Sequence, residues 1–404
     1  MSPPAPSRFM RIAIRSALAV HAGLLNLLTR FGPAVREPGP DGVDILLTGT
    51  FHSANWIKAH IAPLAGAQRC RSITIVGSAD VSGVPHVKVI GAPAWMRRLA
   101  GGVPARLLTF WIVALRTRPH VVGGFHLLIN GLAVPLVAKS AGARGWYFCV
   151  GGPREAIDGG VHQENPYFAR IGTPDAVIER RLLDAVRACD LVITMGSSAA
   201  AYFATQGARR IEVISGGIDA RRFQRNGVVP VFDLLVAARL VPIKRLDRYV
   251  EVVRRLATAR PGFRAAIVGD GPLRGELEAQ AARLDLGSHL TFAGSQTDVG
   301  AWLAKGRIFM LTSESEGLAL AIMEAMTCGL PVVAPRIGDL ADLVEDGVNG
   351  FLVPEPEVAR LADAVQTLLD DPAKLARFGA AAEDTARRYH LPAAVARWDS
   401  VLAN

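Results

Sequence analysis

The stretch "TSESEGLALAIMEAMTCGLPVVAPRIGD", residues 312–339, is the most informative part of the sequence for the fold. Its two glutamates, Glu316 and Glu324, have seven residues between them, and the second lies inside the apolar run "ALAIMEAM". A run of this length that a glycine and a proline follow predicts a helix ending at Cys328. Because such a helix is expected to be buried, a carboxylate within it needs hydrogen-bond donors, which paired sugar hydroxyls supply.

The start of this helix is expected to bind an anion. Ser313 or Ser315 would cap the helix, and the unpaired N–H groups of Gly317 and Leu318 would then bind a phosphate. Eight residues along a helix span about 12 Å, so one carboxylate is expected at the phosphate end and the other about two turns away. The alternatives are a helix-terminus charge for the first glutamate and an exposed position for the second.

Two further motifs carry chemistry. In "ARLVPIKRLD", residues 238–247, Arg239 and Lys244 follow an apolar strand, and cations at the end of a strand neutralise a diphosphate. In "IVGDGPLRGELE", Gly269 and Gly271 would let the backbone approach a planar base or ribose. The alternatives are a solvated loop for the cations and a tight strand-to-helix turn for the glycines.

The chain alternates apolar runs of strand length with amphipathic runs of helix length from residue 43 onward. This pattern predicts an α/β fold in which parallel sheets are covered by helices, and its restart near residues 222–230 predicts two domains. Two doubly wound Rossmann-like domains would face a central cleft lined by the carboxyl ends of both sheets. The expected parts are a basic amphipathic segment at 1–42, Rossmann-like domains at 43–225 and 226–385, and a C-terminal helix at 386–404 that packs back on the first domain.

Taken together in this order, the motifs resemble the family 4 glycosyltransferases, a large retaining family with the GT-B fold. The resemblance covers roughly residues 43–400 and includes "SGGIDARRF", "ARLVPIKRLD", "VGDGPLRGELE", "FAGS", the two spaced glutamates, "GLPVVAP" and "VEDGVNGFLVP". It implies transfer of a hexosyl group from a UDP- or GDP-sugar with retention of anomeric configuration, and it implies no metal, no cofactor and no enzyme nucleophile. The first domain would bind the acceptor and the second the nucleotide sugar.

The resemblance also implies roles for individual residues. Arg239 and Lys244 would hold the donor diphosphate, while Glu324 would take the ribose hydroxyls and Glu316 hydroxyls of the transferred sugar. His126 matches roughly the place where many relatives have a histidine near the reacting sugar, although a structural histidine at this turn is an alternative. The predicted catalytic residues are Glu316, His126 and Lys244, and the remaining predicted donor contacts are Arg239, Gly269, Gly271, Gly317, Leu318 and Glu324.

The first half departs more from the family. After its first strand the chain reads "TGTFHSANW", in which Thr50 and His52 are placed to line the cleft. The long polar loop at residues 151–172 follows the end of a strand, which is unusual without a function. We interpret it as an acceptor loop that contacts the acceptor through Arg154, Glu155 and His162.

Charge is distributed unevenly. The formal net charge is +9, and residues 1–118 hold 14 Lys/Arg against 4 Asp/Glu. A basic front third suggests lipid headgroups or nucleic acid as partner, with a compositional arginine bias as the alternative. The chain has neither an RNA-binding motif nor a recognition helix, so nucleic acid is not expected. The four cysteines are scattered singly, which predicts a reduced, cytoplasmic and metal-free protein.

Two segments combine arginines with apolar and aromatic residues, at 8–31 and 95–118. Such segments suit the headgroup boundary of an anionic membrane, although core helices with snorkelling arginines are the alternative. No segment is a convincing membrane span. Because many relatives glycosylate lipid-linked acceptors, we expect a peripheral protein on the inner face of the plasma membrane. Its acceptor would be a polyprenyl-linked saccharide or a glycolipid in exopolysaccharide or cell-envelope biosynthesis.

Two other functions compete with this hypothesis. A nucleotide-sugar 2-epimerase shares the GT-B fold, but the cation pair before the GDG turn, followed by the two glutamates, favours a transferase. A non-enzymatic protein that binds membrane or nucleic acid would use only the basic front third of the chain.

Overall fold

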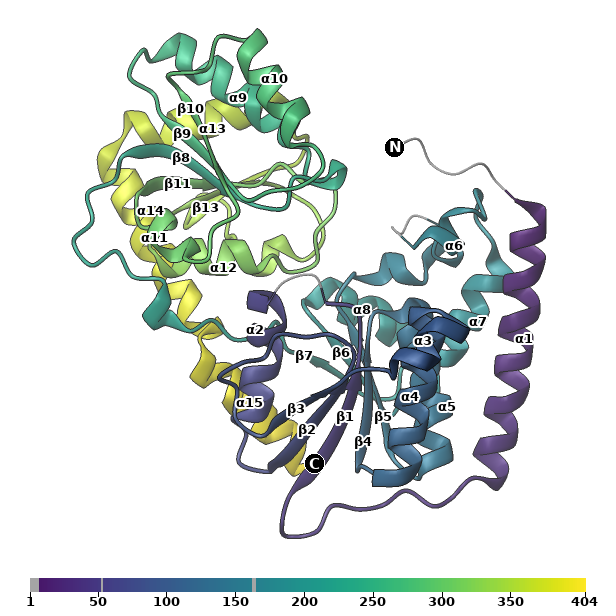
Figure 1. Ribbon diagram of the computed structural model, residues 1–404. Helices are drawn as coiled ribbons and strands as arrows, with labels where there is room; N and C mark the ends of the chain where they lie inside the picture. Colours follow the sequence, from purple (N-terminus) through teal and green to yellow (C-terminus); the bar gives the residue numbers. More distant parts are fainter. Residues whose placement is uncertain (1–6, 52–53, 162–164) are drawn as a thin grey trace. The chain divides into compact units, whose positions relative to one another are not determined.

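The computed structural model describes residues 7–51, 54–161 and 165–404 (Figure 1). These residues form two compact units. Unit 1 comprises Met1–Gly216 together with Ala394–Asn404, and unit 2 comprises Gly217–Ala393.

The boundary between the units lies at Gly216, earlier than the expected boundary after residue 225. Backbone hydrogen bonds explain the difference. Ile218 donates its N–H to the carbonyl oxygen of Tyr389 at 2.9 Å, and its own carbonyl accepts the N–H of Leu391 at 2.8 Å. These bonds hold the start of the connecting segment against residues close to the end of unit 2.

Among the described residues, unit 1 is built on a seven-stranded parallel sheet with the order β3-β2-β1-β4-β5-β6-β7 (Figure 1). Most of these strands are apolar runs buried on both faces, as expected for parallel strands that helices cover. The order reverses between β1 and β4, and ligands bind at such a switch point in doubly wound folds. The strands are β1 (Val43–Thr48), β2 (Cys70–Val76), β3 (Val87–Ile90), β4 (Val121–Phe125), β5 (Arg144–Cys149), β6 (Leu191–Thr194) and β7 (Ile211–Val213).

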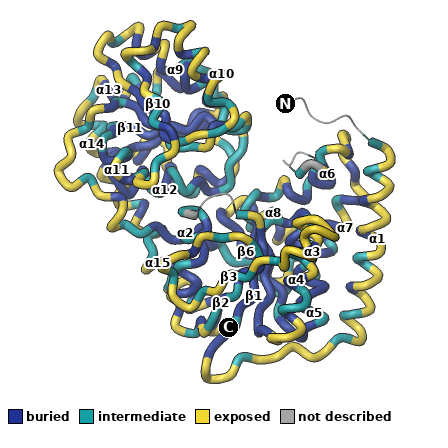
Figure 2. Tube along the Cα trace, viewed as in Figure 1, coloured by how far each residue is buried: buried dark blue, intermediate teal, exposed yellow. Residues whose placement is uncertain are grey.

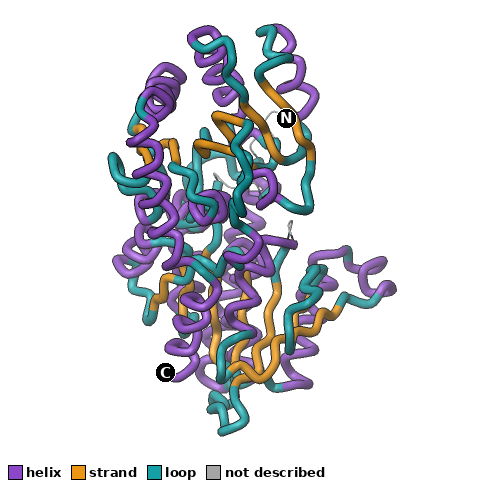
Figure 3. Tube along the Cα trace, turned by 90° about the vertical axis from the view of Figure 1, so that its left-hand side faces the viewer, coloured by secondary structure: helices purple, strands orange, loops and turns teal. Residues whose placement is uncertain are grey.

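Helices lie on both sides of these strands (Figure 3). The C-terminal helix, Leu391–Ala403, packs on β5, where Trp398 stacks on Trp146 with ring centroids 5.7 Å apart. The helices are α1 (Arg8–Phe31), α2 (Ala54–Ala65), α3 (Ala94–Ala100), α4 (Gly102–Thr117), α5 (Leu132–Ala141), α6 (Pro166–Ala169), α7 (Ala176–Arg187), α8 (Ser197–Thr205) and α15 (Leu391–Ala403), which belongs to unit 1 from Ala394 onward.

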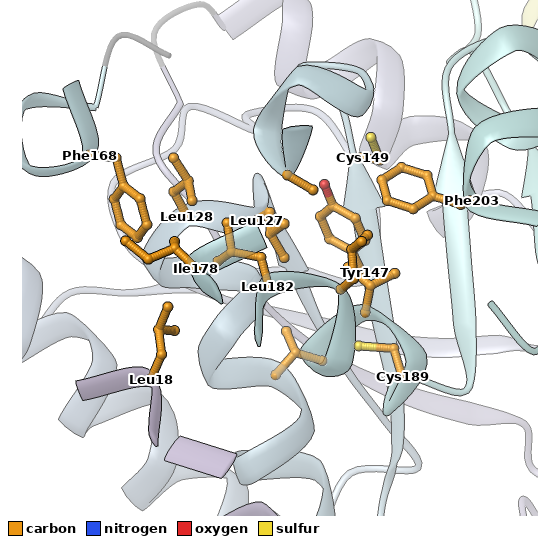
Figure 4. Packing of buried hydrophobic residues seen from close by; sticks show 14 of the residues in the cluster. Leu18, Leu127, Leu128, Tyr147, Cys149, Phe168, Ile178, Leu182, Cys189 and Phe203 are labelled. Atoms are coloured by element: carbon orange, nitrogen blue, oxygen red, sulfur yellow. The ribbon is translucent and has the colours of Figure 1, made fainter. Parts of the chain in front are cut away.

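Helix α1 forms an outer layer on α5 and α7. Ser7 caps it by accepting the N–H of Met10 at 3.2 Å. One face carries the buried residues Ile14, Leu18 and Leu25, and Figure 4 shows Leu18 pointing toward Ile178 of α7. This helix is therefore part of the core of unit 1.

By length and composition, α1 is also the one helix of the described residues that is long and apolar enough to cross a membrane. This finding rests on length and composition alone, so it does not contradict the expectation that no segment is a convincing membrane span. Signal sequences and buried helices of soluble proteins meet the same criterion, so length and composition do not distinguish among these alternatives.

Unit 2 has, within the described residues, a six-stranded parallel sheet with the order β10-β9-β8-β11-β12-β13, which reverses between β8 and β11. In both units the strands are buried and the outer surfaces of the helices are exposed (Figure 2). The strands are β8 (Phe232–Ala237), β9 (Ala265–Val268), β10 (Leu290–Gly294), β11 (Gly306–Met310), β12 (Val332–Pro335) and β13 (Gly350–Val353). The helices are α9 (Leu246–Ala259), α10 (Arg274–Arg283), α11 (Val299–Leu303), α12 (Leu320–Thr327), α13 (Val358–Asp370) and α14 (Pro372–Ala386).

Candidate active site

At the switch point of unit 2, the segment after β8 is hydrogen bonded to the segment after β11. The short helix Pro242–Lys244 follows β8. The hydroxyl of Thr312 donates to the carbonyl oxygen of Lys244 at 2.9 Å. The N–H of Glu314 donates to the carbonyl oxygen of Ile243 at 2.9 Å. Because β8 and β11 are neighbours, these bonds bring two distant sequence motifs together at the carboxyl end of the sheet.

The result is a cluster of three side chains. The ammonium Nζ of Lys244 lies 2.5 Å from Oε1 of Glu316, and the hydroxyl of Ser313 donates to the same oxygen at 2.6 Å. The side chains of Lys244 and Glu316 are 19% and 10% exposed. A half-buried ion pair of this kind holds both charges in fixed positions beside the switch point, where they can face a charged ligand.

Helix α12 starts later than expected. It begins at Leu320 with Ala319 as its N-cap, so the predicted helix start at Ser313 or Ser315 is wrong, and Gly317 and Leu318 precede the helix. The hydroxyl of Ser313 donates a hydrogen bond to Glu316 instead of capping the helix.

The packing of a neighbouring loop keeps this segment out of the helix. A Cβ atom on Gly338, which has a φ of +51°, would lie 1.9 Å from the carbonyl oxygen of Glu316. The backbone after Glu316 is thus held against the loop that follows β12. The spacing of about 12 Å inferred for a continuous helix therefore does not apply to Glu316 and Glu324, since one lies on a loop and the other on a helix.

Glu324 lies on α12, half-buried, and its carboxylate makes no hydrogen bond to another described side chain. Burial raises the pKa of Glu324 to about 7, against the lowering effect of the Arg222 charge. Arg222 ends the short helix Ala220–Arg222. Sequence reasoning missed this cation, although it stands in the quoted phrase "SGGIDARRF".

The raised pKa of Glu324 makes the stability of unit 2 depend on pH. Between about pH 4.5 and pH 7 the folded unit binds more protons than the unfolded chain, so its stability falls as pH rises through this window. We expect Glu324→Gln to be more stable than the wild type at about pH 8, by at most about 3 kcal/mol, with the difference lost below about pH 4.5. Urea unfolding across this pH range measures it.

The control for this experiment is Glu276→Gln, which changes an exposed glutamate on α10. Its unfolding profile should run parallel to that of the wild type. If Glu324→Gln also ran parallel at every pH, the carboxyl of Glu324 would not titrate near neutrality.

The glycine-rich turn after β9 is explained by packing within unit 2. A Cβ atom on Gly269 would lie 1.9 Å from the carbonyl oxygen of Ala238, and one on Gly271 would lie 2.5 Å from that of Leu240. Both glycines therefore serve the close approach of this turn to the segment after β8. Arg239 lies in that segment, exposed, and forms no ion pair with another described residue.

In unit 1, β4 ends at Phe125 and His126 follows with a φ of +65°. Nδ1 of His126 lies 2.9 Å from Oε1 of Glu155. A carboxylate at this nitrogen holds the ring in the tautomer with the proton on Nδ1. In the neutral ring Nε2 is then the acceptor nitrogen, which suits a role in binding a hydroxyl group.

Glu155 itself is 2% exposed, so the prediction that it contacts the acceptor is wrong. Its carboxylate also accepts hydrogen bonds from Tyr147 Oη at 2.7 Å, from the N–H of Gly151 at 3.0 Å and from the N–H of Leu127. Burial by itself raises the pKa of Glu155. The hydrogen bond and the charge of His126 lower this pKa, and the hydrogen bonds from Tyr147 and Leu127 lower it further. The residue is an ionised anchor inside the unit.

The other predicted acceptor residues have different surroundings. Arg154 is exposed, and Thr50 is exposed after the end of β1. His52 and His162 lie outside the described residues. Arg106, which the sequence places in a membrane-contacting segment, instead donates a hydrogen bond from Nη1 to Thr50 Oγ1 at 3.1 Å. Sequence reasoning therefore missed a cation at the carboxyl end of the unit 1 sheet.

An open hollow of about 780 Å³ lies elsewhere on unit 2, and none of the predicted donor residues lines it. Its lining mixes both charge signs, and the guanidinium of Arg245 in its wall is paired with Asp247 and Glu314. Within the described ranges, no group of three or more His, Cys, Asp or Glu side chains is arranged to hold a metal ion.

Comparison with known proteins shows what part of this chain resembles. Residues 219–385 match the family "Glycosyl transferases group 1". This stretch lies within unit 2 and contains the Lys244–Glu316 cluster, Arg239 and Glu324.

Two curated relatives match parts of the chain. An alpha-D-kanosaminyltransferase of Streptomyces kanamyceticus is 33% identical over 164 residues, which cover 40% of this chain and 42% of the relative. The Vi polysaccharide biosynthesis protein VipC/TviE of Salmonella typhi is 33% identical over 126 residues, which cover 31% of this chain and 22% of the relative. The matched part thus spans less than half of each of these relatives.

A solved structure extends the likeness to the whole fold. Anabaena HepE, crystallised with UDP and glucose, is 22% identical and superimposes with a TM-score of 0.69 over 90% of this chain and 100% of its own. The fold expected from the sequence, a GT-B fold with two doubly wound α/β domains, is confirmed.

Proposed function

We propose that this protein is a retaining, metal-independent glycosyltransferase of family 4. It would transfer a hexosyl group from a UDP- or GDP-sugar to a membrane-associated acceptor, such as a polyprenyl-linked saccharide or a glycolipid, in cell-envelope polysaccharide biosynthesis. The supporting observation is that the group 1 glycosyltransferase match falls on unit 2, where Lys244 and Glu316 meet at the carboxyl ends of β8 and β11.

In this proposal, unit 2 binds the donor through charges and hydroxyl contacts. Lys244 keeps two of its three N–H donors beyond the one directed at Glu316, so it can bind the diphosphate while the ion pair persists. Arg239, exposed and without an ion-pair partner among the described residues, supplies a second cation. Glu324 takes the ribose hydroxyls, and Glu316 takes hydroxyls of the transferred sugar.

Sugar transfer then needs charge stabilisation more than an enzyme nucleophile. Negative charge grows on the diphosphate as the glycosidic bond breaks, and cations fixed near the leaving group stabilise that charge. In the proposed retaining reaction, a donor phosphate oxygen accepts the proton of the acceptor hydroxyl, which attacks from the face that the diphosphate leaves. His126, held by Glu155, would orient the hexose through a hydroxyl group.

The test uses purified full-length protein with UDP- and GDP-hexoses, lipid-linked saccharide acceptors and EDTA. We expect hexosyl transfer to the lipid fraction, with an α-linked product from an α-configured donor. A product of inverted configuration would contradict retention. Absence of transfer from every donor, together with conversion of a nucleotide sugar in the absence of acceptor, would favour an isomerase instead.

Membrane contact through α1 is part of the proposal. The exposed apolar residues of α1 recur at spacings of three, four and eight residues, which places them on one stripe of the helix, opposite the buried stripe of Ile14, Leu18 and Leu25. The exposed stripe consists of Phe9, Ile12, Val20, Leu24, Leu27 and Phe31. Such a stripe beside arginines fits the interface of an anionic membrane on its cytoplasmic face.

The contacts of α1 favour a helix that lies along the membrane rather than across it. Arg15 forms two hydrogen bonds of 3.0 Å with Asp175, whose side chain is fully buried at the start of α7. Nε2 of His21 lies 2.7 Å from the carbonyl oxygen of Leu132 at the start of α5. These contacts keep one face of α1 on unit 1 and leave the other to face lipid.

We expect Phe9→Glu, Val20→Glu and Phe31→Glu in combination to reduce binding to anionic vesicles at least about tenfold, because each change removes apolar burial and adds like charge. Flotation with vesicles containing phosphatidylglycerol measures this. The control combines Val228→Glu, Val229→Glu and Val231→Glu, since it adds the same three charges at exposed valines of unit 2. Equal flotation of the triple variant and the wild type would show that α1 does not contact the membrane.

The α3–α4 region, with Trp95 and Leu99 exposed, would then be tested in the same way.

A further inference from the structure

Arg106 of α4 reaches across the carboxyl ends of three neighbouring strands of unit 1. Its Nη1 donates to the carbonyl oxygen of Gly49 at 2.8 Å and to the hydroxyl of Thr50 at 3.1 Å, both after β1. Its Nη2 donates to Oδ1 of Asn130 at 2.7 Å, in the loop after β4. A Cβ atom on Gly77, which follows β2, would lie 3.7 Å from Cδ of Arg106. The guanidinium therefore sits at the switch point between β1 and β4.

The same contacts tie Arg106 to the strand end that carries His126. The side-chain amide of Asn130 donates to the carbonyl oxygen of Phe125 at 3.0 Å, directly before His126. The N–H of Gly131 donates to the carbonyl oxygen of His126 at 2.8 Å. Arg106 and His126 thus belong to one hydrogen-bonded region at the carboxyl end of β4.

No carboxylate neutralises this cation among the described residues. All three of its hydrogen-bond acceptors are neutral, and its Nε is buried without a partner in the described part of the chain. Arg15 and Arg71 of unit 1 are, by contrast, paired with Asp175 and Asp44. Removing a charge from water without a counter-charge is costly, and burial lowers the pKa of Arg106 with no opposing contribution.

We propose that unit 1 has a phosphate-binding site at the carboxyl ends of β1 and β4, with Arg106 as its cation and the exposed hydroxyl of Thr50 as a second donor. The second N–H of Nη2, beyond the one directed at Asn130, completes the donor set. The inference rests on the proposed function and adds to it, because it assigns a phosphate-bearing substrate to unit 1. That phosphate belongs either to a phosphorylated acceptor or to the nucleotide sugar.

The first test removes the cation. Inorganic phosphate is titrated calorimetrically into the full-length protein, and Arg106→Gln is expected to bind it about ten- to a hundredfold more weakly, the usual loss for a hydrogen bond to a charged group. Arg209→Gln removes an equal charge from an exposed position of unit 1 between α8 and β7 and should bind phosphate like the wild type.

The second test keeps Arg106 and cancels its charge. Thr50 is exposed and already contacts Nη1, so Thr50→Asp places a carboxylate beside the guanidinium without removing a core residue. Phosphate affinity should fall as far as in Arg106→Gln, while Thr50→Asn, of the same size but neutral, should keep most of it. This pair of variants decides the question even if Arg106→Gln folds poorly.

Saturating UDP separates the two sources of phosphate. If the site takes the phosphate of an acceptor, Arg106-dependent phosphate binding persists with UDP bound, and UDP affinity is the same in Thr50→Asp and Thr50→Asn. If the site takes the phosphate of the nucleotide sugar, saturating UDP abolishes the Arg106-dependent binding of inorganic phosphate. Thr50→Asp then weakens UDP binding as well. Equal phosphate binding by the wild type, Arg106→Gln and Thr50→Asp would overturn the inference, even if sugar transfer were observed. Arg106-dependent phosphate binding in a protein that transfers no sugar would instead contradict only the proposed function.

Discussion

Lys244→Ala is expected to lower kcat for sugar transfer by about 100- to 1000-fold, the range for loss of one group that stabilises developing charge. Lys244 is held beside Glu316 at a distance of 2.5 Å, at the carboxyl end of β8. Its removal takes away a cation from the proposed diphosphate site. It also leaves the carboxylate of Glu316, only 10% exposed, to repel the diphosphate. Steady-state rates at saturating donor measure the change.

A second variant separates these two contributions. Repulsion by the uncompensated carboxylate should weaken nucleotide binding in Lys244→Ala, whereas loss of the cation should lower kcat. Adding Glu316→Gln should therefore recover nucleotide affinity while kcat stays low. The control is Arg283→Ala, which removes an exposed cation in the last turn of α10 and should leave kcat unchanged. A kcat for Lys244→Ala within about threefold of the wild type would rule out the proposed role in charge stabilisation.

Glu155→Ala is expected to destabilise unit 1 by about 3–5 kcal/mol, as breaking a buried ionic network does. The change leaves four donors without their acceptor: the N–H groups of Leu127 and Gly151, the hydroxyl of Tyr147, and Nδ1 of His126. For a unit of this size the melting temperature should fall on the order of 10 °C. Differential scanning calorimetry measures it.

Tyr147→Phe is the matched control, because it removes one donor and leaves the carboxylate with the other three. It should cost only about 1 kcal/mol, the usual net value of one hydrogen bond. If Glu155→Ala and Tyr147→Phe melted at the same temperature, the carboxylate would not be the anchor of this loop.

Periodicity made the fold predictable from sequence. Buried parallel strands are apolar along most of their length, so runs such as Ala265–Val268 are recognisable without tertiary information. The alternation of such runs with helices then determines the fold class. The position of the unit boundary was not recognisable in this way. It depends on the hydrogen bonds of Ile218 with residues more than 150 positions away in the chain.

The candidate site was predictable only in part. Lys244 and Glu316 were recognisable as candidates because their motifs are local, and the structure brings the two side chains together. The start of α12 was misplaced because Gly338, distant in sequence, packs on the backbone at Glu316. Arg106 was assigned to a membrane segment, since an arginine in an amphipathic run has the same local pattern whether it points to lipid or to a strand end. Glu155 lies in a polar loop, and nothing in that loop signals that its carboxylate turns inward.

The ion pair of Lys244 and Glu316 has a consequence for selectivity. With its charge already balanced, this part of the resting unit offers little attraction to chloride or other monovalent salts, which would have to compete with an internal carboxylate for the same ammonium. A nucleotide sugar bound as proposed would gain more from the exchange, because it would also engage a second cation such as Arg239 and bring hydroxyl donors for the carboxylates. In the proposed donor site, the pair would therefore favour ligands that offer several matched groups at once over common small anions.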